Sequence, residues 1–179
     1  PSEGSLCDAS NLVNVPGKAG WADVITVPIA QINSGEDVLV CGYGGGDNIT
    51  GSDANDIIES GDTGSSTLNG GAGNDVLRGT NEADTLNGGD NNDVLVGREG
   101  DDVLDGGNDQ NIYLPGAGAD TVKGGPGLDI VFFEGNRGDY GTTNCSKTSC
   151  TITQTDKPNK TLKNVEILIF DNARLDLPD

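Results

Sequence analysis

The sequence predicts an all-β solenoid, and three observations support that prediction. The first is a nine-residue repeat, which runs ten times between Gly42 and Phe132 with one extra residue, Ser60. The second is that nine of the ten units open on glycine, which tolerates the positive φ angles of sharp turns. The third is that each unit ends by alternating about an apolar eighth-place residue, as in a short strand with one inward side chain. An internal repeat of this kind outweighs the other signals in a sequence.

The repeat also predicts which units are neighbours. Two units close one coil of the solenoid, so every second unit stacks on the same side at a spacing of about 4.8 Å. The sixth-place residues therefore form two columns. The first column is predicted to hold Asp37, Asp56, Asp75, Asp93, Asn111 and Asp129, and the second Asp47, Ser66, Asp84, Asp102 and Asp120.

Columns of aspartate at this spacing need a cation, because like charges so close together repel each other. Calcium is the ion we expect, since it takes about 6–8 oxygen ligands from carboxylates and backbone carbonyls. With one ion between neighbouring members of a column, roughly four to nine calcium ions are expected. Ser66 and Asn111 depart from aspartate, so we expect weak sites there. Third-place oxygens either add ligands or are solvated turn residues; these are Asp53, Asn81, Asp90 and Asn108.

The units match the pattern G-G-x-G-x-D-x-U-x, most fully in Gly70–Arg78 and Gly124–Phe132. The chain thereby resembles the RTX (hemolysin-type calcium-binding) repeat family. This resemblance implies a parallel β-roll with calcium between successive turns. It extends to Arg137–Tyr140 (R-G-D-Y) and to the segment that begins N-V-E at Asn164, which look like the strands that close the family's roll. The R-G-D tripeptide is therefore interpreted as part of this cap rather than as an integrin ligand.

Segments on both sides of the repeat are predicted to cap the roll. Val24–Ile32 alternates like a strand, and Pro28 within it indicates an edge strand. Ile32–Val40 is interpreted as a degenerate unit with Asp37 at its sixth place. The predicted domains are 1–41 for the N-terminal arm and capping strands, 42–132 for the calcium-binding β-roll, and 133–179 for the C-terminal β cap.

Within the C-terminal cap, we expect a hairpin and then a buried strand. The hairpin pairs Thr142–Cys145 with Cys150–Thr155, and the strand is Thr161–Asp171. A disulfide between Cys145 and Cys150 would hold the two hairpin strands together.

The two other cysteines, Cys7 and Cys41, would then pair by elimination and tie the arm to the first coil. A zinc site is the competing interpretation, but the chain has no histidine and no C-x-x-C pair. Disulfides together with a calcium-dependent repeat predict a protein that is secreted, extracellular or on the cell surface.

Composition excludes several function classes. The formal net charge of −19 makes a nucleic-acid partner unfavourable. No apolar run approaches the length of a membrane span, so no transmembrane segment is expected. Without histidine, a Ser-His or Cys-His nucleophile pair cannot exist. We therefore expect no enzyme activity and no small-molecule substrate.

Two functions remain. The first is a calcium-binding structural protein, which folds on binding calcium and associates with copies of itself in a cell-surface or filamentous assembly. The alternative is a non-catalytic calcium-binding C-terminal module of a larger secreted enzyme or toxin. Fold alone does not separate them.

Overall fold

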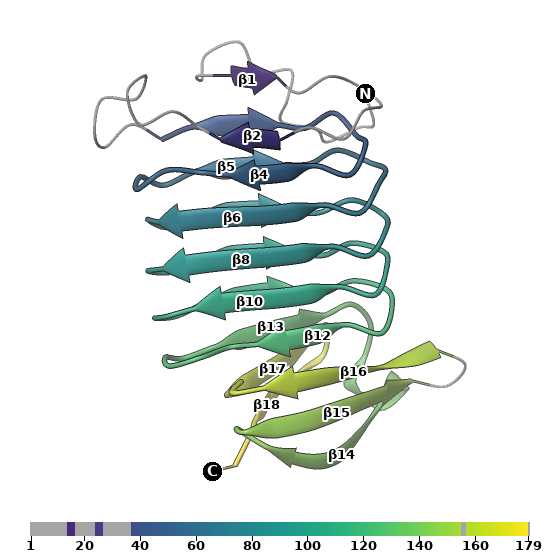
Figure 1. Cartoon of the computed structure of the whole chain (residues 1–179). Helices are drawn as coiled ribbons and strands as arrows, with labels where there is room; N and C mark the ends of the chain where they lie inside the picture. The colour runs from purple at the N-terminus through teal and green to yellow at the C-terminus, as the bar shows by residue number, and fades with distance from the viewer. Residues whose placement is uncertain (1–13, 17–23, 27–36, 155–156, 179) are drawn as a thin grey trace.

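The structure, a computed structural model, describes residues 14–16, 24–26, 37–154 and 157–178. Short strands stack into a flattened solenoid of about five turns, with two sheets face to face (Figure 1). The single helical element in the described ranges is a 3-10 turn, Arg137–Asp139. The predicted all-β parallel β-roll is therefore confirmed.

The two sheets alternate along the chain. The first contains, in spatial order, β1 (Asn14–Pro16), β3 (Leu39–Cys41), β5 (Ile57–Glu59), β7 (Val76–Arg78), β9 (Val94–Val96), β11 (Ile112–Leu114), β13 (Ile130–Phe133), β17 (Ile167–Phe170) and β18 (Ala173–Asp176). The second contains β14 (Tyr140–Ser146), β15 (Ser149–Gln154), β16 (Lys157–Lys163), β12 (Thr121–Lys123), β10 (Val103–Gly107), β8 (Thr85–Asp90), β6 (Thr67–Ala72), β4 (Asn48–Thr50) and β2 (Val24–Thr26).

The strands of the repeat pair in parallel with a register of two units. Leu86 lies beside Leu68, and Leu95 lies beside Leu77, so neighbouring coils are eighteen residues apart. Across the extra residue Ser60 the separation grows by one, as in the pairing of Ile58 with Leu77. The insertion therefore lengthens one turn and leaves the register of the strands unchanged.

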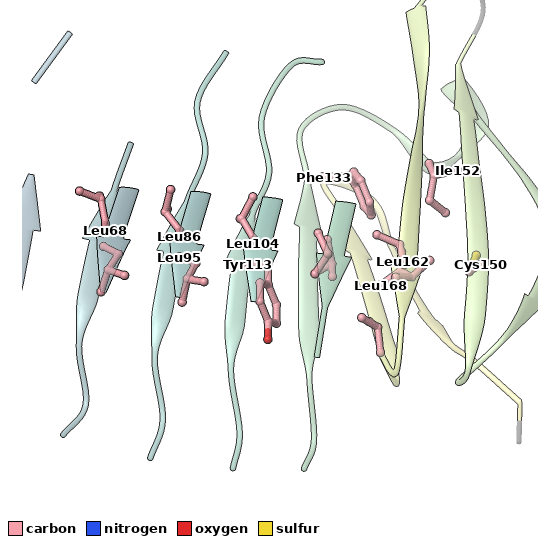
Figure 2. Packing of buried hydrophobic residues seen from close by; sticks show 14 of the residues in the cluster. Leu68, Leu86, Leu95, Leu104, Tyr113, Phe133, Cys150, Ile152, Leu162 and Leu168 are labelled. Carbon is pink, nitrogen blue, oxygen red and sulfur yellow. The ribbon is translucent and has the colours of Figure 1, made fainter. Parts of the chain in front are cut away.

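The core is a file of eighth-place side chains between the two sheets (Figure 2). Each strand of the repeat contributes one inward residue that is fully buried, which stabilises the roll by about 1.5–3 kcal/mol for a leucine. A core only two side chains wide leaves the turns to supply much of the remaining stability. The buried eighth-place residues are Ile49, Ile58, Leu68, Leu77, Leu86, Leu95, Leu104, Tyr113, Val122 and Val131.

At the N-terminal end, the predicted register of the degenerate unit is wrong by one residue. Leu39 pairs with Ile57, which places Val38 beside Asp56 and leaves Asp37 exposed. The inward residue is thus Val40. Three consecutive apolar residues carry no alternation, so the sequence does not say which of them points inward. Of the predicted segment Val24–Ile32, β2 is a parallel strand beside β4, and residues 27–36 lie outside the described ranges.

At the C-terminal end, the parallel ladder continues beyond the predicted boundary at Phe132. β16 stacks in parallel on β12, and β17 stacks in parallel on β13. The predicted single strand Thr161–Asp171 is therefore wrong: the chain turns a corner at Asn164, whose φ is +50°, and passes from one sheet to the other. This corner makes one more coil of the roll (yellow in Figure 1).

The antiparallel hairpin β14–β15 precedes that last coil, as predicted, and carries the expected disulfide between Cys145 and Cys150. Cys41 is also disulfide-bonded. Its predicted partner, Cys7, lies outside the described residues.

The R-G-D segment belongs to the cap. The guanidinium of Arg137 lies 5.5 Å from the ring centroid of Phe170 and donates to the Tyr140 carbonyl at 2.6 Å. Asp139 accepts a hydrogen bond from the backbone N–H of Asn136 at 3.1 Å. Phe133 stacks on Phe170 with ring centroids 5.3 Å apart, so this segment closes the apolar end of the roll.

Candidate metal centre

Sixth-place residues form two columns along the two edges of the roll. The part of one repeat unit that lies in a column is called a rung, and each rung is named by its sixth-place residue. In the first column the backbone N–H of one rung donates to the side chain of the next. Asp56 donates to Asp75 Oδ1 at 2.7 Å, Asp75 to Asp93 Oδ1 at 2.8 Å, and Asp93 to Asn111 Oδ1 at 2.9 Å. One carboxylate oxygen of each aspartate is thereby used to hold neighbouring coils together.

The second column repeats this ladder. Ser66 donates through its backbone to Asp84 Oδ1 at 2.6 Å, Asp84 to Asp102 Oδ1 at 2.8 Å, and Asp102 to Asp120 Oδ1 at 3.0 Å. These aspartates are 3% exposed or less, so the ladder runs through buried surroundings.

The second carboxylate oxygen, Oδ2, lies over the glycine that opens the same unit. A methyl group on Gly70 would lie 2.2 Å from Asp75 Oδ2 and 2.7 Å from the carbonyl oxygen of Gly88 in the next coil. Glycine is required there because any side chain would collide with both oxygens. A carboxylate oxygen and a backbone carbonyl that converge in this way are ligands that calcium takes in proteins.

At four rungs this Oδ2 is buried and receives no hydrogen bond from the described residues; the rungs are Asp75, Asp93, Asp102 and Asp129. A buried carboxylate oxygen without a donor is costly. Burial raises the pKa of Asp75, Asp102 and Asp129 to about 7, and that of Asp93 to about 6. Neighbouring carboxylates contribute a smaller part of each rise in pKa. A divalent cation would remove this penalty, so these four rungs fit calcium.

No group of three or more acidic, histidine or cysteine side chains converges anywhere in the described ranges. An ion in either column would therefore depend on one or two carboxylates and on the carbonyls of the turns. The carbonyls that converge with Oδ2 on the opening glycine at the rungs of Asp75, Asp93, Asp102 and Asp129 belong, in that order, to Gly88, Gly106, Pro115 and Asn164.

A comparison with known protein families gives the same assignment. The family model for the RTX calcium-binding nonapeptide repeat matches residues 60–82, 78–113 and 116–139, in four copies. These coils are RTX calcium-binding nonapeptide repeats. No curated protein matches the chain in sequence. RTX repeats bind Ca²⁺ in general, and the matched residues include Asp75, Asp93, Asp102 and Asp129.

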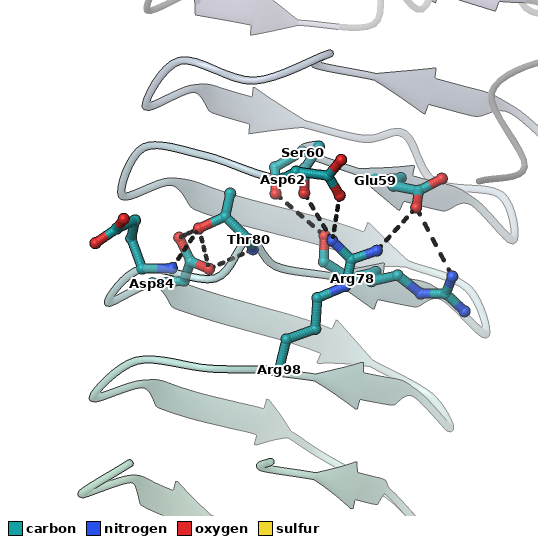
Figure 3. A network of polar contacts seen from close by, with 9 residues as sticks. Glu59, Ser60, Asp62, Arg78, Thr80, Asp84 and Arg98 are labelled. Carbon is teal, nitrogen blue, oxygen red and sulfur yellow. Dashed lines mark hydrogen bonds and ion pairs between the residues drawn. The ribbon is translucent and has the colours of Figure 1, made fainter. Parts of the chain in front are cut away.

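In two units, a side chain and a backbone N–H of the same turn donate to the sixth-place aspartate. Ser52 donates to Asp56 Oδ2 through its backbone N–H at 2.6 Å, and its hydroxyl lies 2.9 Å from the same oxygen. Thr80 does the same for Asp84, at 2.6 Å and 3.1 Å (Figure 3). Burial still raises the pKa of both aspartates, while these hydrogen bonds lower it.

The Asn111 rung does not fit calcium. Its Nδ2 donates to the carbonyl of Asn108 at 3.1 Å, so an amide donor stands where other rungs have an oxygen. The hydroxyl of Tyr113 fills the space beside Gly106 and donates to the carbonyl of Lys123 at 3.0 Å. The protein's own groups therefore replace the ion at this rung.

The Ser66 rung also lacks a carboxylate. Ser66 Oγ accepts a hydrogen bond from the backbone N–H of Asp47 at 3.1 Å and donates one to the carbonyl oxygen of Gly64. Nearby, Arg98 reaches across a coil and donates from Nη1 to the carbonyl of Gly61 at 2.7 Å, while its Nη2 lies 3.1 Å from Glu59 (Figure 3). The Arg98 guanidinium is thus held against the turn that contains the extra residue Ser60.

The remaining predicted site residues differ in their surroundings. Asp47 is buried at the start of the second column, Asp120 accepts from Lys160 at its end, and Asp37 is exposed. The third-place residues Asp53, Asn81, Asp90 and Asn108 are all exposed, as expected for solvated turn residues.

Glu166 is a site residue that the repeat pattern did not predict. Its Oε2 accepts from the backbone N–H of Asp129 at 2.8 Å, so it forms the next rung of the first column. Glu166 and the buried Leu168 have the spacing of the sixth and eighth places, which is the signal that could have revealed it.

Proposed function

We propose that the chain is an extracellular calcium-binding structural protein whose β-roll folds when calcium fills the two columns. The observation that carries this proposal is the buried Oδ2 without a donor at Asp75, Asp93, Asp102 and Asp129. Four such rungs, with Asp47, Asp56 and Asp84 as further candidates, lie within the expected range of roughly four to nine ions.

Calcium would decide whether the roll is folded. An ion present at a hundredfold excess over its dissociation constant adds about 2.7 kcal/mol per site. Four such sites together match the whole stability of an ordinary domain, about 5–15 kcal/mol. The bound ion supplies positive charge between carboxylates, and the chain supplies the glycine turns that bring carboxylate and carbonyl oxygens together.

The test is calorimetric titration of the metal-free chain with calcium. We expect at least four ions per chain, and a variant with the four aspartates changed to asparagine should lose four. The matched control is Asp53→Asn, an exposed third-place residue that should lose none. Binding of fewer than two ions by the unaltered chain would contradict the proposal.

A location outside the cytosol is supported by the disulfides of Cys145–Cys150 and Cys41, and RTX repeats typically occur in secreted proteins. Among the residues that the structure describes, no helix is long and apolar enough to cross a membrane.

The assembly part of the proposal rests on a contrast between the outer faces of the two sheets. On β9, β11 and β13 of the first sheet, every outward residue is apolar, and Leu114 and Phe132 are 39% and 37% exposed. The second sheet presents threonine, asparagine and charged residues at the same places, as in β6, β8 and β12. Exposed apolar patches of this kind mark interaction surfaces.

The partner that we propose is a second copy of this chain. In a molecule with a net charge of −19, copies repel each other except where carboxylates are absent, and the outward residues of β9, β11 and β13 include none. Two flat sheets can pack face to face about 10 Å apart. Light scattering of the calcium-loaded chain tests this: we expect an assembly that Phe132→Lys disperses and that Thr85→Lys, on the other sheet, leaves intact.

The alternative, a non-catalytic module of a larger secreted enzyme or toxin, would use the same apolar face against a neighbouring domain. In that case the calcium-loaded chain would remain a monomer at high concentration. A monomeric result would remove the proposed assembly with a second copy and leave the proposal of calcium binding unaffected.

A further inference from the structure

One basic side chain, that of Lys160, lies within the second column. Lys160 is in β16, where Thr161 pairs with Thr121, so Lys160 stands at the sixth place beside Asp120. It is 5% exposed, and the side chain of Asp120 is fully buried. The last rung of the second column is therefore a lysine.

Lys160 contacts a carboxylate oxygen and a backbone carbonyl oxygen, the two kinds of ligand that calcium takes in proteins. Its Nζ donates to Asp120 Oδ2 and, at 2.8 Å, to the carbonyl oxygen of Gly118. Gly118 is the fourth residue of the unit to which Asp120 belongs. A buried ammonium is tolerated only when it is paired and hydrogen-bonded, and these two oxygens meet both conditions.

The last rung of the first column shows the contrast. There the corresponding residue is Glu166, an acid, and Asp129 Oδ2 receives no donor from the described residues. Asp120 Oδ2, in the same relation to its neighbour, is satisfied by Lys160. The two columns thus end in opposite charges at equivalent positions.

We propose that the Lys160 ammonium is a built-in counter-ion that closes the last rung of the second column to calcium and fastens the C-terminal cap to the roll. A calcium ion and an ammonium cannot share two oxygens, because the two cations repel each other in buried surroundings. The exclusion of calcium rests on the proposed calcium-binding function, whereas the fastening of the cap does not.

The first experiment counts ions by native mass spectrometry at saturating calcium. Lys160→Asp should bind one calcium more than the unaltered chain, because a carboxylate at this rung restores the arrangement of the first column. Lys163→Asp is the matched control on the same strand, since Lys163 is exposed, and its count should not change. Equal counts for Lys160→Asp and the unaltered chain would overturn the proposal.

If Lys160→Asp fails to fold in calcium, Lys160→Glu takes its place, since it reproduces the residue found at Glu166. Failure of both variants to fold with calcium would also overturn the proposal, because a carboxylate at this rung would then recruit no ion.

The second experiment measures hydrogen exchange of the Thr161 amide, which donates to the Asp120 carbonyl at 2.8 Å. Lys160→Met should speed its exchange at least about tenfold, because it leaves the buried Asp120 unpaired. Lys163→Met should leave it unchanged. An unchanged rate in Lys160→Met would refute the fastening role, even if the unaltered chain bound no calcium and the proposed function itself failed.

Discussion

Asp93 and Asn111 occupy neighbouring rungs of one column, yet their chemistry is opposite. At Asp93 a buried carboxylate oxygen faces the Gly106 carbonyl with no donor from the described residues. At Asn111 an amide and the hydroxyl of Tyr113 provide donors to the surrounding carbonyls. A repeated sequence thus need not be a repeated binding site.

The difference between these rungs involves two positions of one unit. Tyr113 pairs with Leu95 in the core, so tyrosine has replaced an aliphatic residue in the same unit in which asparagine has replaced aspartate. The hydroxyl needs a partner when it is buried, and the carbonyls left by the missing ion supply one. Loss of the ligand and filling of its space are therefore one structural change.

The largest expected effect comes from removing calcium altogether. If the rungs of the Asp93 kind require an ion, excess chelator should abolish most of the far-UV circular dichroism signal of the roll, and calcium should restore it. Magnesium at equal concentration is the control, because it demands a tighter octahedral geometry and should restore much less. A full β signal in chelator would show that rungs of the Asn111 kind suffice.

The pH should act on the calcium-free roll through the same carboxylates. The pKa values of Asp75, Asp102 and Asp129 are about 7 in the fold, above the ordinary aspartate value near 3.9. Between about pH 4 and 7 the folded chain therefore binds more protons than the unfolded chain, and its stability rises as the pH falls. In excess chelator, the chain should therefore recover more of its far-UV circular dichroism β signal at pH 5 than at pH 8. The reverse order would mean that these oxygens are not buried without donors.

Removing one ligand should have a smaller, local effect. Asp93→Asn is expected to lose one ion and about 2.7 kcal/mol of stability at a hundredfold excess of calcium. Calcium-dependent unfolding and an ion count measure both quantities. The control Asp90→Asn, at an exposed third place, should change neither. A normal ion count in Asp93→Asn would remove the distinction between the two rungs.

Converting the Asn111 rung into a calcium site is the most sensitive test of its comparison with the Asp93 rung. Asn111→Asp alone should not gain an ion, because the Tyr113 hydroxyl still fills the space beside Gly106. Asn111→Asp combined with Tyr113→Leu should gain one, as counted by native mass spectrometry. A gain in the single variant would show that Tyr113 does not block the site.

The sequence by itself determined the period, the two sheets and the two columns. A nine-residue unit with glycine at the first place and an aliphatic residue at the eighth has one compact solution, in which coils stack every eighteen residues. It also located the Cys145–Cys150 disulfide, because a hairpin brings together residues close in sequence. Local signals of this kind can be interpreted without knowledge of the rest of the chain.

Only the tertiary structure decided the ends of the columns and the state of each oxygen. Val38 rather than Asp37 precedes Asp56 because burial, which is not visible in a run of apolar residues, sets the register there. Lys160 and Glu166 join the columns only after the hairpin β14–β15 has interrupted the period, so the eighteen-residue spacing of the coils does not connect them to Asp120 and Asp129. Whether an aspartate is ready for calcium depends on donors from the same turn and the core, and those contacts exist only once the coils have stacked.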